Sequence, residues 1–247
     1  MGIIGFSTPF DFSAVDFLEN LNVPFYKIAS FENYDLPLLK YVAKTGKPVI
    51  MSTGMIQLEE LKESVRVLIE NGCPEIVLLK CTSTYPAEPR KTNLLTITDM
   101  QKQFPDCIIG LSDHTLGTAV SVASIALGAK VIEKHFTLSR ADGGVDSSFS
   151  MEPEEMSKLV SDVNVAYKSL GNTFYGPTEA EIPSLKFRRS LYVVKDIKKG
   201  EQFTPENVRS IRPANGLSTA YYEDVLTKEA LADIPAGTPL TREMWKK

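Results

Sequence analysis

Short apolar runs, rich in β-branched residues, recur along the first two thirds of the chain and alternate with amphipathic stretches. The runs begin roughly 22 to 31 residues apart, which is the spacing of βα units in a parallel sheet. They are apolar throughout, as strands buried on both faces are. The six runs are Ile3–Phe6, Phe25–Ala29, Val49–Met51, Ile76–Leu79, Cys107–Leu111 and Val131–Phe136. Six βα units are compatible with a doubly wound sheet or with a (β/α)8 barrel that lacks two units.

Helical spacing fills the segments between the runs. Residues 58–68 carry one apolar stripe, and a glycine soon after it signals the helix end. A final helix is predicted over Pro153–Leu170, because proline suits the first turn and Gly171 follows the last. No Gly-x-Gly-x-x-Gly follows a predicted strand, so the sequence does not support a dinucleotide site.

The periodicity ends at Gly171, and the composition changes after a Pro- and Gly-containing stretch. In the last part, Asp196-Ile197-x-x-Gly200-x-x-x-Thr204-x-Glu206 recurs 37 residues later as Asp233-Ile234-x-x-Gly237-x-x-x-Thr241-x-Glu243. Two related half-units predict a small pseudo-symmetric β-rich domain, and the alternative is a helical extension of the barrel. The predicted organisation is a barrel domain at 1–171, a linker at 172–188 and a small domain at 189–247.

Composition argues against several classes of protein. The 247 residues carry a formal charge of −4, so nucleic acid is a poor candidate partner. No apolar run reaches the ~18–20 residues that a membrane span needs. The three cysteines, Cys73, Cys81 and Cys107, form no CxxC motif, which argues for a reducing compartment and against a disulfide framework. We expect a cytoplasmic protein without a membrane partner.

Each of the six predicted strands ends on a hydroxyl residue. The ends read Phe6-Ser7-Thr8-Pro9, Ile28-Ala29-Ser30, Met51-Ser52-Thr53-Gly54, Cys81-Thr82-Ser83-Thr84, Leu111-Ser112-Asp113-His114 and Lys134-His135-Phe136-Thr137. The carboxyl ends of barrel strands form the active-site face, and hydroxyls with backbone N–H groups suit a phosphate or another oxyanion. A single such residue is explained as well by helix capping. The six together favour a site.

Charged and imidazole side chains occur at the same strand ends. His114 and His135 are the only histidines, and neutral imidazoles suit a divalent transition metal. Glu133 shares the pleat face of His135 and is a candidate supporting partner or base. Lys27 lies inside an apolar strand, where it either meets a bound anion or extends to water. Asp146, in a glycine-containing loop, is either a ligand for sugar hydroxyls or a solvated turn residue.

Five motifs together resemble the sialic acid synthase family, and the C-terminal segment resembles its antifreeze-like SAF domain. The five motifs are Ser7-Thr8-Pro9-Phe10-Asp11, Tyr26-Lys27-Ile28-Ala29-Ser30, Met51-Ser52-Thr53-Gly54-Met55, Gly110-Leu111-Ser112-Asp113-His114-Thr115 and Ile132-Glu133-Lys134-His135-Phe136. Within the family, segments 80–87, 146–150 and 189–197 are most similar to the pseudaminic acid synthases.

The resemblance implies a transferase that condenses phosphoenolpyruvate with an acetamido sugar. A sugar of the 2,4-diacetamido-2,4,6-trideoxy-L-altrose type would give pseudaminic acid and phosphate. The alternative is an N-acetylneuraminate or legionaminate synthase that uses N-acetylmannosamine or a related sugar. A second alternative, from another class, is an inactive remnant that binds sugar or phosphate. A third is a metal-dependent aldolase acting on a phosphorylated sugar.

The resemblance also implies roles for individual residues. Phosphoenolpyruvate would contact Thr8, Lys27, Ser30, Ser52, Ser83 and Ser112, and the sugar would contact Tyr85, Asp146 and Arg212. His114 and His135 would bind the metal, typically Mn²⁺, with Mg²⁺ or Co²⁺ as alternatives. Arg212 would lie over the site of a partner subunit, which implies a domain-swapped homodimer.

The family barrel starts with two further βα units, which hold a catalytic glutamate and a second phosphate-binding lysine. This chain matches the family from its third strand onward. We therefore expect a (β/α)8 TIM-type barrel without its first two βα units, followed by a SAF (β-clip) domain. The family glutamate would lie outside the chain, leaving Glu133 as the candidate catalytic carboxylate.

Overall fold

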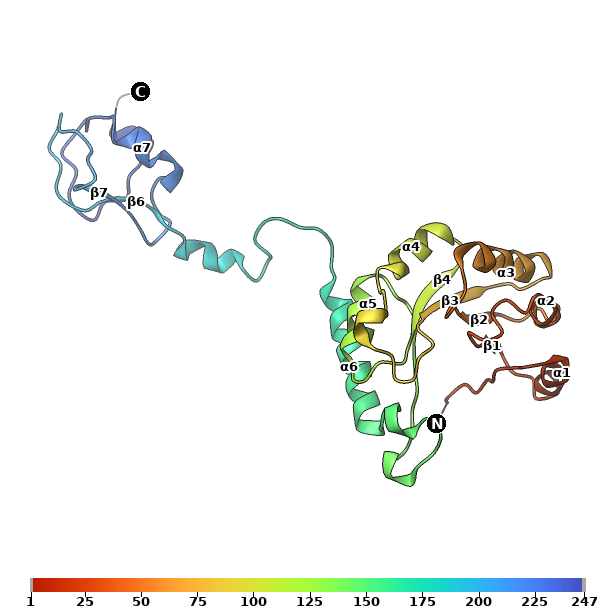
Figure 1. Cartoon of the computed structure of the whole chain (residues 1–247). Helices are drawn as coiled ribbons and strands as arrows, with labels where there is room; N and C mark the ends of the chain where they lie inside the picture. Colours follow the sequence, from red (N-terminus) through yellow and green to blue (C-terminus); the bar gives the residue numbers. More distant parts are fainter. Residues whose placement is uncertain (1, 246–247) are drawn as a thin grey trace. The chain divides into compact units, whose positions relative to one another are not determined.

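The computed structural model describes residues 2–245. The chain divides into two compact units, Met1–Gly171 and Asn172–Lys247 (Figure 1). No helix in the described part of the chain is both long enough and apolar enough to cross a membrane.

A curled parallel sheet of five strands forms the frame of the first unit (Figure 1). The strands are β1 (Tyr26–Ile28), β2 (Val49–Ser52), β3 (Ile76–Cys81), β4 (Ile108–Asp113) and β5 (Ile132–Lys134). The helices are α1 (Phe12–Asn20), α2 (Leu36–Ala43), α3 (Leu58–Glu70), α4 (Thr96–Gln103), α5 (Ala119–Ala126) and α6 (Pro153–Ser169). Each strand pairs with the next one along the chain, so the sheet is wound in one direction, as in a barrel. The predicted barrel architecture is confirmed in the form of a half-barrel.

One predicted strand is absent from residues 2–245. Ile3–Phe6 forms no strand, and its side chains are largely exposed. The segment meets the sheet where the Lys27 N–H donates to the Ser7 carbonyl at 3.3 Å. A strand requires a ladder of such bonds, and an apolar, β-branched sequence does not supply one by itself. The prediction of six strands is therefore wrong by one.

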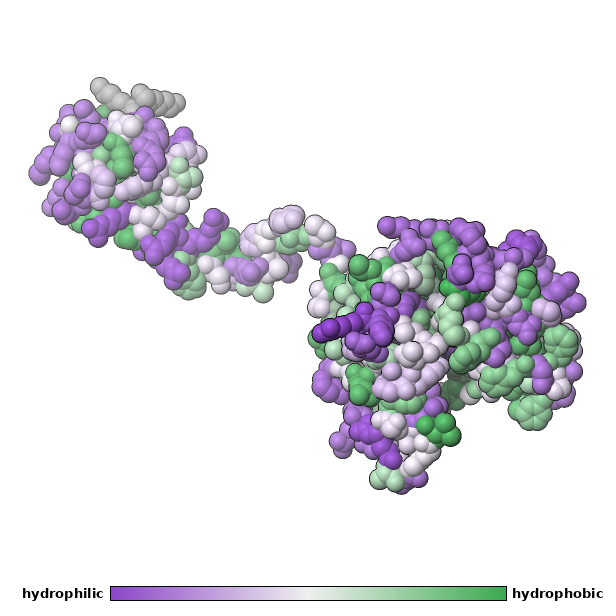
Figure 2. Space-filling view, in the orientation of Figure 1, coloured by the Kyte–Doolittle hydropathy of each residue, from purple (hydrophilic) through white to green (hydrophobic). Residues whose placement is uncertain are grey.

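Two edges of the sheet lie open in the described part of the chain, at β1 and at β5. Near the β1 edge, Phe17 in α1 and Leu21 directly after it are exposed, and hydrophobic residues gather on this surface (Figure 2). Beside β5, a pocket is lined mainly by apolar side chains, among them Ile132 and Val160. Open edges and exposed apolar surface of this kind favour pairing with another segment or chain.

Local sequence signals account for the helix starts. Asp11 caps α1, since its carboxylate accepts a hydrogen bond from the Ala14 N–H at 2.8 Å. In α6, Pro153 occupies the first turn and the Glu155 carboxylate accepts from the Glu152 N–H at 2.9 Å. Such caps fix where the loops between strands and helices end, and these loops carry the candidate site residues.

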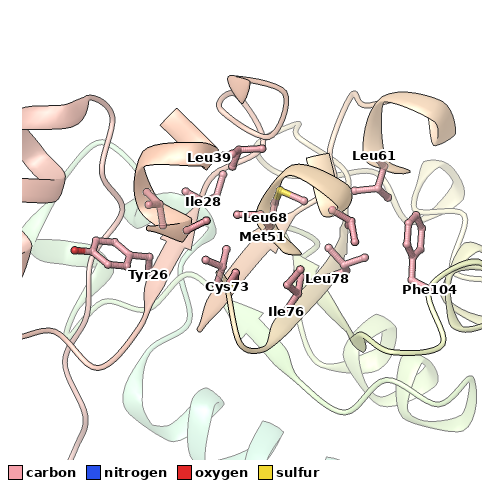
Figure 3. Close-up of a cluster of buried hydrophobic side chains, with 14 of the residues drawn as sticks. Tyr26, Ile28, Leu39, Met51, Leu61, Leu68, Cys73, Ile76, Leu78 and Phe104 are labelled. Carbon is pink, nitrogen blue, oxygen red and sulfur yellow. The ribbon is translucent and has the colours of Figure 1, made fainter. Parts of the chain in front are cut away.

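Alternation along the strands separates a hydrophobic core from a polar concave face. Outward side chains, such as Ile28, Met51 and Leu78, pack against helix residues including Leu39 and Leu68 (Figure 3). Successive strand residues face opposite sides, so the intervening positions all face inward. The inward positions near the strand ends are Lys27, Ser52, Cys81, Ser112 and Glu133.

The second unit has its own hydrophobic core and an internal symmetry. It contains an antiparallel pair, β6 (Ser190–Val193) and β7 (Val208–Ile211), and a short helix, α7 (Tyr222–Val225). The two sequence repeats pair through Ile197 and Ile234, which exchange both backbone hydrogen bonds, at 2.9 and 2.8 Å. Asp196 and Asp233 each accept a backbone N–H of the opposite repeat, at 2.8 and 2.9 Å. The prediction of a small pseudo-symmetric β-rich unit is confirmed.

Candidate active site

Lys27, Ser52, Ser112 and Glu133 meet on the concave face. Lys27 Nζ donates to Ser52 Oγ at 2.8 Å and lies 3.5 Å from Glu133 Oε2. Ser112 Oγ donates to Glu133 Oε1 at 2.7 Å. Lys27 is only 8% exposed, so its charge is held out of water against a carboxylate and does not extend to solvent. In their present positions, these three donors already surround an oxyanion.

A second group of hydroxyls surrounds Gly54. Ser30 Oγ accepts the Gly54 N–H at 3.1 Å. The buried Asn33 amide donates to the carbonyls of Ser52 and Gly54, at 3.2 and 2.9 Å, which fixes the turn after β2. A methyl group on Gly54 would lie 2.1 Å from Ser83 Oγ and 2.7 Å from Ser30 Oγ. Glycine therefore lets the hydroxyls of two other strand ends approach this turn.

The two histidines lie next to each other, directly after β4 and β5. Their ring centroids are 5.2 Å apart. His114 is buried, and its Nδ1 lies 2.9 Å from the Thr82 carbonyl oxygen. In the neutral ring this bond assigns the proton to Nδ1 and leaves the Nε2 lone pair available. His135 Nδ1 lies 3.5 Å from Asp146 Oδ2.

Burial and hydrogen bonding act differently on the two histidines. Burial, and then repulsion from His114, lowers the pKa of His135 and favours its neutral ring. Burial also opposes the charge on His114, but its hydrogen bonds, first that with Cys81, outweigh burial and raise the pKa of His114. Burial opposes ionisation of the Cys81 thiol, yet hydrogen bonds led by that of His114 lower its pKa to about 7. Cys81 Sγ lies 3.9 Å from His114 Nδ1.

The donor set around the histidines fits a divalent cation that keeps an open coordination shell. Between residues 2 and 245, no three or more His, Cys, Asp or Glu side chains are arranged to hold a metal by themselves. His114 and His135 can supply two imidazole nitrogens. The remaining ligands would be water and substrate oxygens, and this mixed nitrogen and oxygen set suits a divalent transition metal such as manganese.

Aromatic side chains line the histidine side of the site. The Tyr85 ring centroid lies 4.3 Å from that of His114 and 5.8 Å from that of His135. The Phe149 centroid lies 5.0 Å from that of His135. Tyr85 and Asp146 are exposed, so a ligand above the histidines can reach both. The structure thus gathers Tyr85, Asp146 and the two histidines on one side of the concave face.

Thr8 and Arg212 are the two predicted site residues that make none of the contacts described above. Thr8 precedes α1, in the segment that contacts β1 through Ser7, and its hydroxyl makes no hydrogen bond to another residue between 2 and 245. Arg212 is exposed in the second unit, directly after β7. The roles that the resemblance implies for both residues stay predictions.

Sequence reasoning did not single out Glu32 or Cys81. One carboxylate oxygen of Glu32 is buried without a hydrogen-bond partner among the described residues. Burial, and then the nearby Asp35 carboxylate, raises the pKa of Glu32. Its position two residues after Ser30, at a strand end, was a usable signal. For Cys81, the usable signal was the alternation of side chains along β3, which places Cys81 on the inward face.

A barrel face of this kind is typical of enzymes that act on small acidic or phosphorylated molecules. Residues 1–175 match the NeuB family, and residues 188–244 match the SAF domain. The chain therefore belongs to the NeuB family and carries a SAF domain. The resemblance seen in the sequence is confirmed.

Several relatives are named as sugar acid synthases. Pseudaminic acid synthase of Campylobacter jejuni is 42% identical over 239 residues, which cover 97% of this chain and 69% of that protein. N,N'-diacetyllegionaminic acid synthase of the same organism is 42% identical over 227 residues, covering 91% and 68%. The crystal structure of N-acetylneuraminic acid synthetase from Leptospira borgpetersenii, in complex with citrate, superposes with a TM-score of 0.67 at 33% identity, covering 72% of this chain and 62% of that one.

Proposed function

We propose that the chain is a nonulosonic acid synthase that condenses phosphoenolpyruvate with an acetamido sugar. The preferred sugar is of the 2,4-diacetamido-2,4,6-trideoxy-L-altrose type. One water is consumed, and the products are pseudaminic acid and phosphate. The arrangement of Lys27, Ser52 and Ser112 around a carboxylate, next to a histidine pair, carries the proposal. The similarity to a pseudaminic acid synthase supports the choice of product.

In this proposal, phosphoenolpyruvate binds on the lysine side of the concave face. Its acidic groups compete with Glu133 for the donors of Lys27, Ser52 and Ser112. These donors are fixed by strand ends, so they can stabilise charge on a departing phosphate without rearranging. The hydroxyls of Ser30 and Ser83, with that of Thr8, complete the set of contacts, and the Gly54 turn leaves room for them.

The sugar binds on the histidine side, next to Tyr85 and Asp146. His114 and His135 hold a divalent cation, by preference Mn²⁺. When bound, this cation would polarise the sugar carbonyl oxygen. The Thr82 carbonyl orients the His114 ring. The reacting carbons of the two substrates then meet between the lysine side and the histidine side.

We also propose that the chain acts as a domain-swapped homodimer, in which Arg212 contacts the sugar of the partner subunit. An arginine can pair with two oxygens of one ligand at once. Mixing Arg212→Ala subunits with His114→Ala subunits tests this. Activity should reappear once subunit exchange is confirmed, because a share of the sites then carries neither defect. No recovery would mean that Arg212 serves its own subunit or no site.

A second candidate product is legionaminic acid. The diacetyllegionaminic acid synthase is as similar to this chain, at 42%, as the pseudaminic acid synthase is. A panel of acetamido sugars of both types, with N-acetylmannosamine included, separates the candidates by kcat/KM.

Phosphate release tests the proposed reaction. The chain is incubated with Mn²⁺, each sugar and either phosphoenolpyruvate or pyruvate, and phosphate and product mass are followed. We expect one phosphate per nonulosonic acid with phosphoenolpyruvate and no product with pyruvate. Calorimetric binding of phosphoenolpyruvate without turnover would identify a binding remnant. Product from pyruvate would identify an aldolase.

A further inference from the structure

The residues that precede the two histidines form a buried ion pair. Lys134 Nζ lies 3.0 Å from Asp113 Oδ2, and the two side chains are only 2% and 1% exposed. Asp113 and Lys134 are directly opposite each other in the ladder of β4 and β5. Neighbouring strand residues point to opposite faces, so the pair lies on the outer face, directly behind His114 and His135.

Asp113 is held from several sides. Its Oδ1 accepts the N–H and the hydroxyl of Thr115, each at 2.8 Å. Its Oδ2 accepts the hydroxyl of Ser121, in α5, at 2.6 Å. Lys134 also donates to the Thr115 carbonyl. A buried ion pair stabilises a structure only when its remaining hydrogen bonds are satisfied, and this one joins β4, the turn after it, α5 and β5.

The two histidines differ in their other support. His114 is held by the Thr82 carbonyl, and the Tyr85 ring packs against it at an interplanar angle of 42°. His135 follows β5, a strand of three residues that pairs within the sheet only with β4 in the described part of the chain. Outside the sheet, the His135 carbonyl accepts the Met151 N–H at 2.8 Å, and the exposed Asp146 carboxylate lies 3.5 Å from its Nδ1. On the sheet side, the Lys134 side chain ties the end of this short edge strand to Asp113 at the end of β4 and to the turn after it.

We propose that the Asp113–Lys134 pair is a positioning device that holds His135 at a fixed place relative to His114, so that both rings can bind one cation. The inference rests on the metal site of the proposed function. Asp113 and Lys134 touch neither the cation nor the substrate, and they act through the residue that follows each of them. Groups that support metal ligands from behind commonly change metal affinity by about 10- to 100-fold when they are lost.

Lys134→Gln tests the inference in the full chain with Mn²⁺ alone as the probe. Free Mn²⁺ is measured by electron paramagnetic resonance at equilibrium. We expect the dissociation constant of Mn²⁺ in Lys134→Gln to rise by about 10- to 100-fold relative to the unaltered chain. Lys134→Arg keeps the charge and should restore most of the affinity. Lys47→Gln is the matched control, because Lys47 and Glu19 form an ion pair of 2.7 Å at the opposite end of the sheet, away from the histidines.

A metal-free measurement separates this inference from the proposed function. The chain has two histidines, so nitrogen-edited NMR of the imidazoles resolves each ring. In Lys134→Gln, the His135 signals should shift and broaden, while His114 should keep its Nδ1–H pattern. If the unaltered chain binds no Mn²⁺, the proposed metal site is wrong and the imidazole spectra alone decide the positioning.

Unchanged Mn²⁺ affinity together with an unchanged His135 spectrum in folded Lys134→Gln would overturn the inference. If that variant does not fold, Asp113→Asn replaces it. Asparagine has nearly the same shape and keeps an oxygen for the two Thr115 donors, while its NH2 group faces Lys134 and Ser121 in place of Oδ2. The ion pair is then lost, and the same two results are expected. Weak Mn²⁺ binding by Lys47→Gln would also count against the inference. It would mean that the loss of any ion pair lowers the Mn²⁺ affinity, wherever the pair lies in the sheet.

Discussion

Replacing Lys27 by methionine should weaken ligand binding far more than it weakens the fold. Lys27 Nζ donates to Ser52 Oγ at 2.8 Å and to the Ile28 carbonyl at 3.1 Å, and it lies 3.5 Å from Glu133. A hydrogen bond to a charged group contributes about 1.5–3 kcal/mol, so its loss should weaken phosphoenolpyruvate binding by roughly 10- to 100-fold.

Stability should change less, for two reasons. Removing a buried charge also removes the cost of keeping that charge out of water. The Glu133 side chain is 36% exposed, so it can turn toward solvent when its partner is lost. We expect the free energy of unfolding to change by no more than about 1 kcal/mol, the range of partly exposed ion pairs.

Calorimetric titration of phosphoenolpyruvate, with urea unfolding of the same samples, measures both quantities. Lys80→Met is the matched control. Lys80 is also 8% exposed, but it faces outward and donates to the Cys81 carbonyl at 3.1 Å and the Thr82 hydroxyl at 2.6 Å. The Lys80→Met variant should bind phosphoenolpyruvate with the affinity of the unaltered chain. Unchanged affinity in Lys27→Met, or an equal loss in both variants, would refute the reasoning.

Replacing His114 or His135 by alanine should weaken Mn²⁺ binding at least ~10-fold in equilibrium dialysis, and unchanged binding in both variants would place the metal elsewhere. Gly54→Ala should weaken phosphoenolpyruvate binding in calorimetry, because the added methyl lies 2.1 Å from Ser83 Oγ and overpacking costs about 1–3 kcal/mol. Gly5→Ala, where a methyl meets nothing within 4 Å, is its control. The 247-residue chain alone should aggregate with rising concentration in light scattering, because no further strand pairs with either edge of the sheet within residues 2–245. A monomer with one reversible melting transition would contradict this.

Much of the frame follows from patterns within short segments. The spacing of apolar runs predicts five of the observed strands, and the glycine after the last helical stripe predicts where α6 ends to within one residue. The position of hydroxyls at strand ends places Ser52 and Ser112 on one face, because the period of two is a local property of each strand. The 37-residue repeat predicts a pseudo-symmetric unit, since identical segments tend to pack alike.

Contacts between strands were harder to anticipate. The sequence places Glu133 on the face of His135, but only the register of the ladder shows that its carboxylate meets Lys27 and Ser112. The same register makes Asp113 and Lys134 partners. Ile3–Phe6 was misassigned for the same reason, because a strand depends on neighbours that its own residues do not reveal.

A crystal of the chain grown with Mn²⁺ and phosphoenolpyruvate tests most directly whether one concave face holds both ligands. Anomalous scattering locates the Mn²⁺ independently of the protein atoms. We expect a single strong peak between the rings of His114 and His135, with phosphoenolpyruvate against Lys27, Ser52 and Ser112 in place of the Glu133 carboxylate. A peak away from both imidazoles, or phosphoenolpyruvate bound elsewhere while Glu133 keeps its present contacts, would contradict the proposed site.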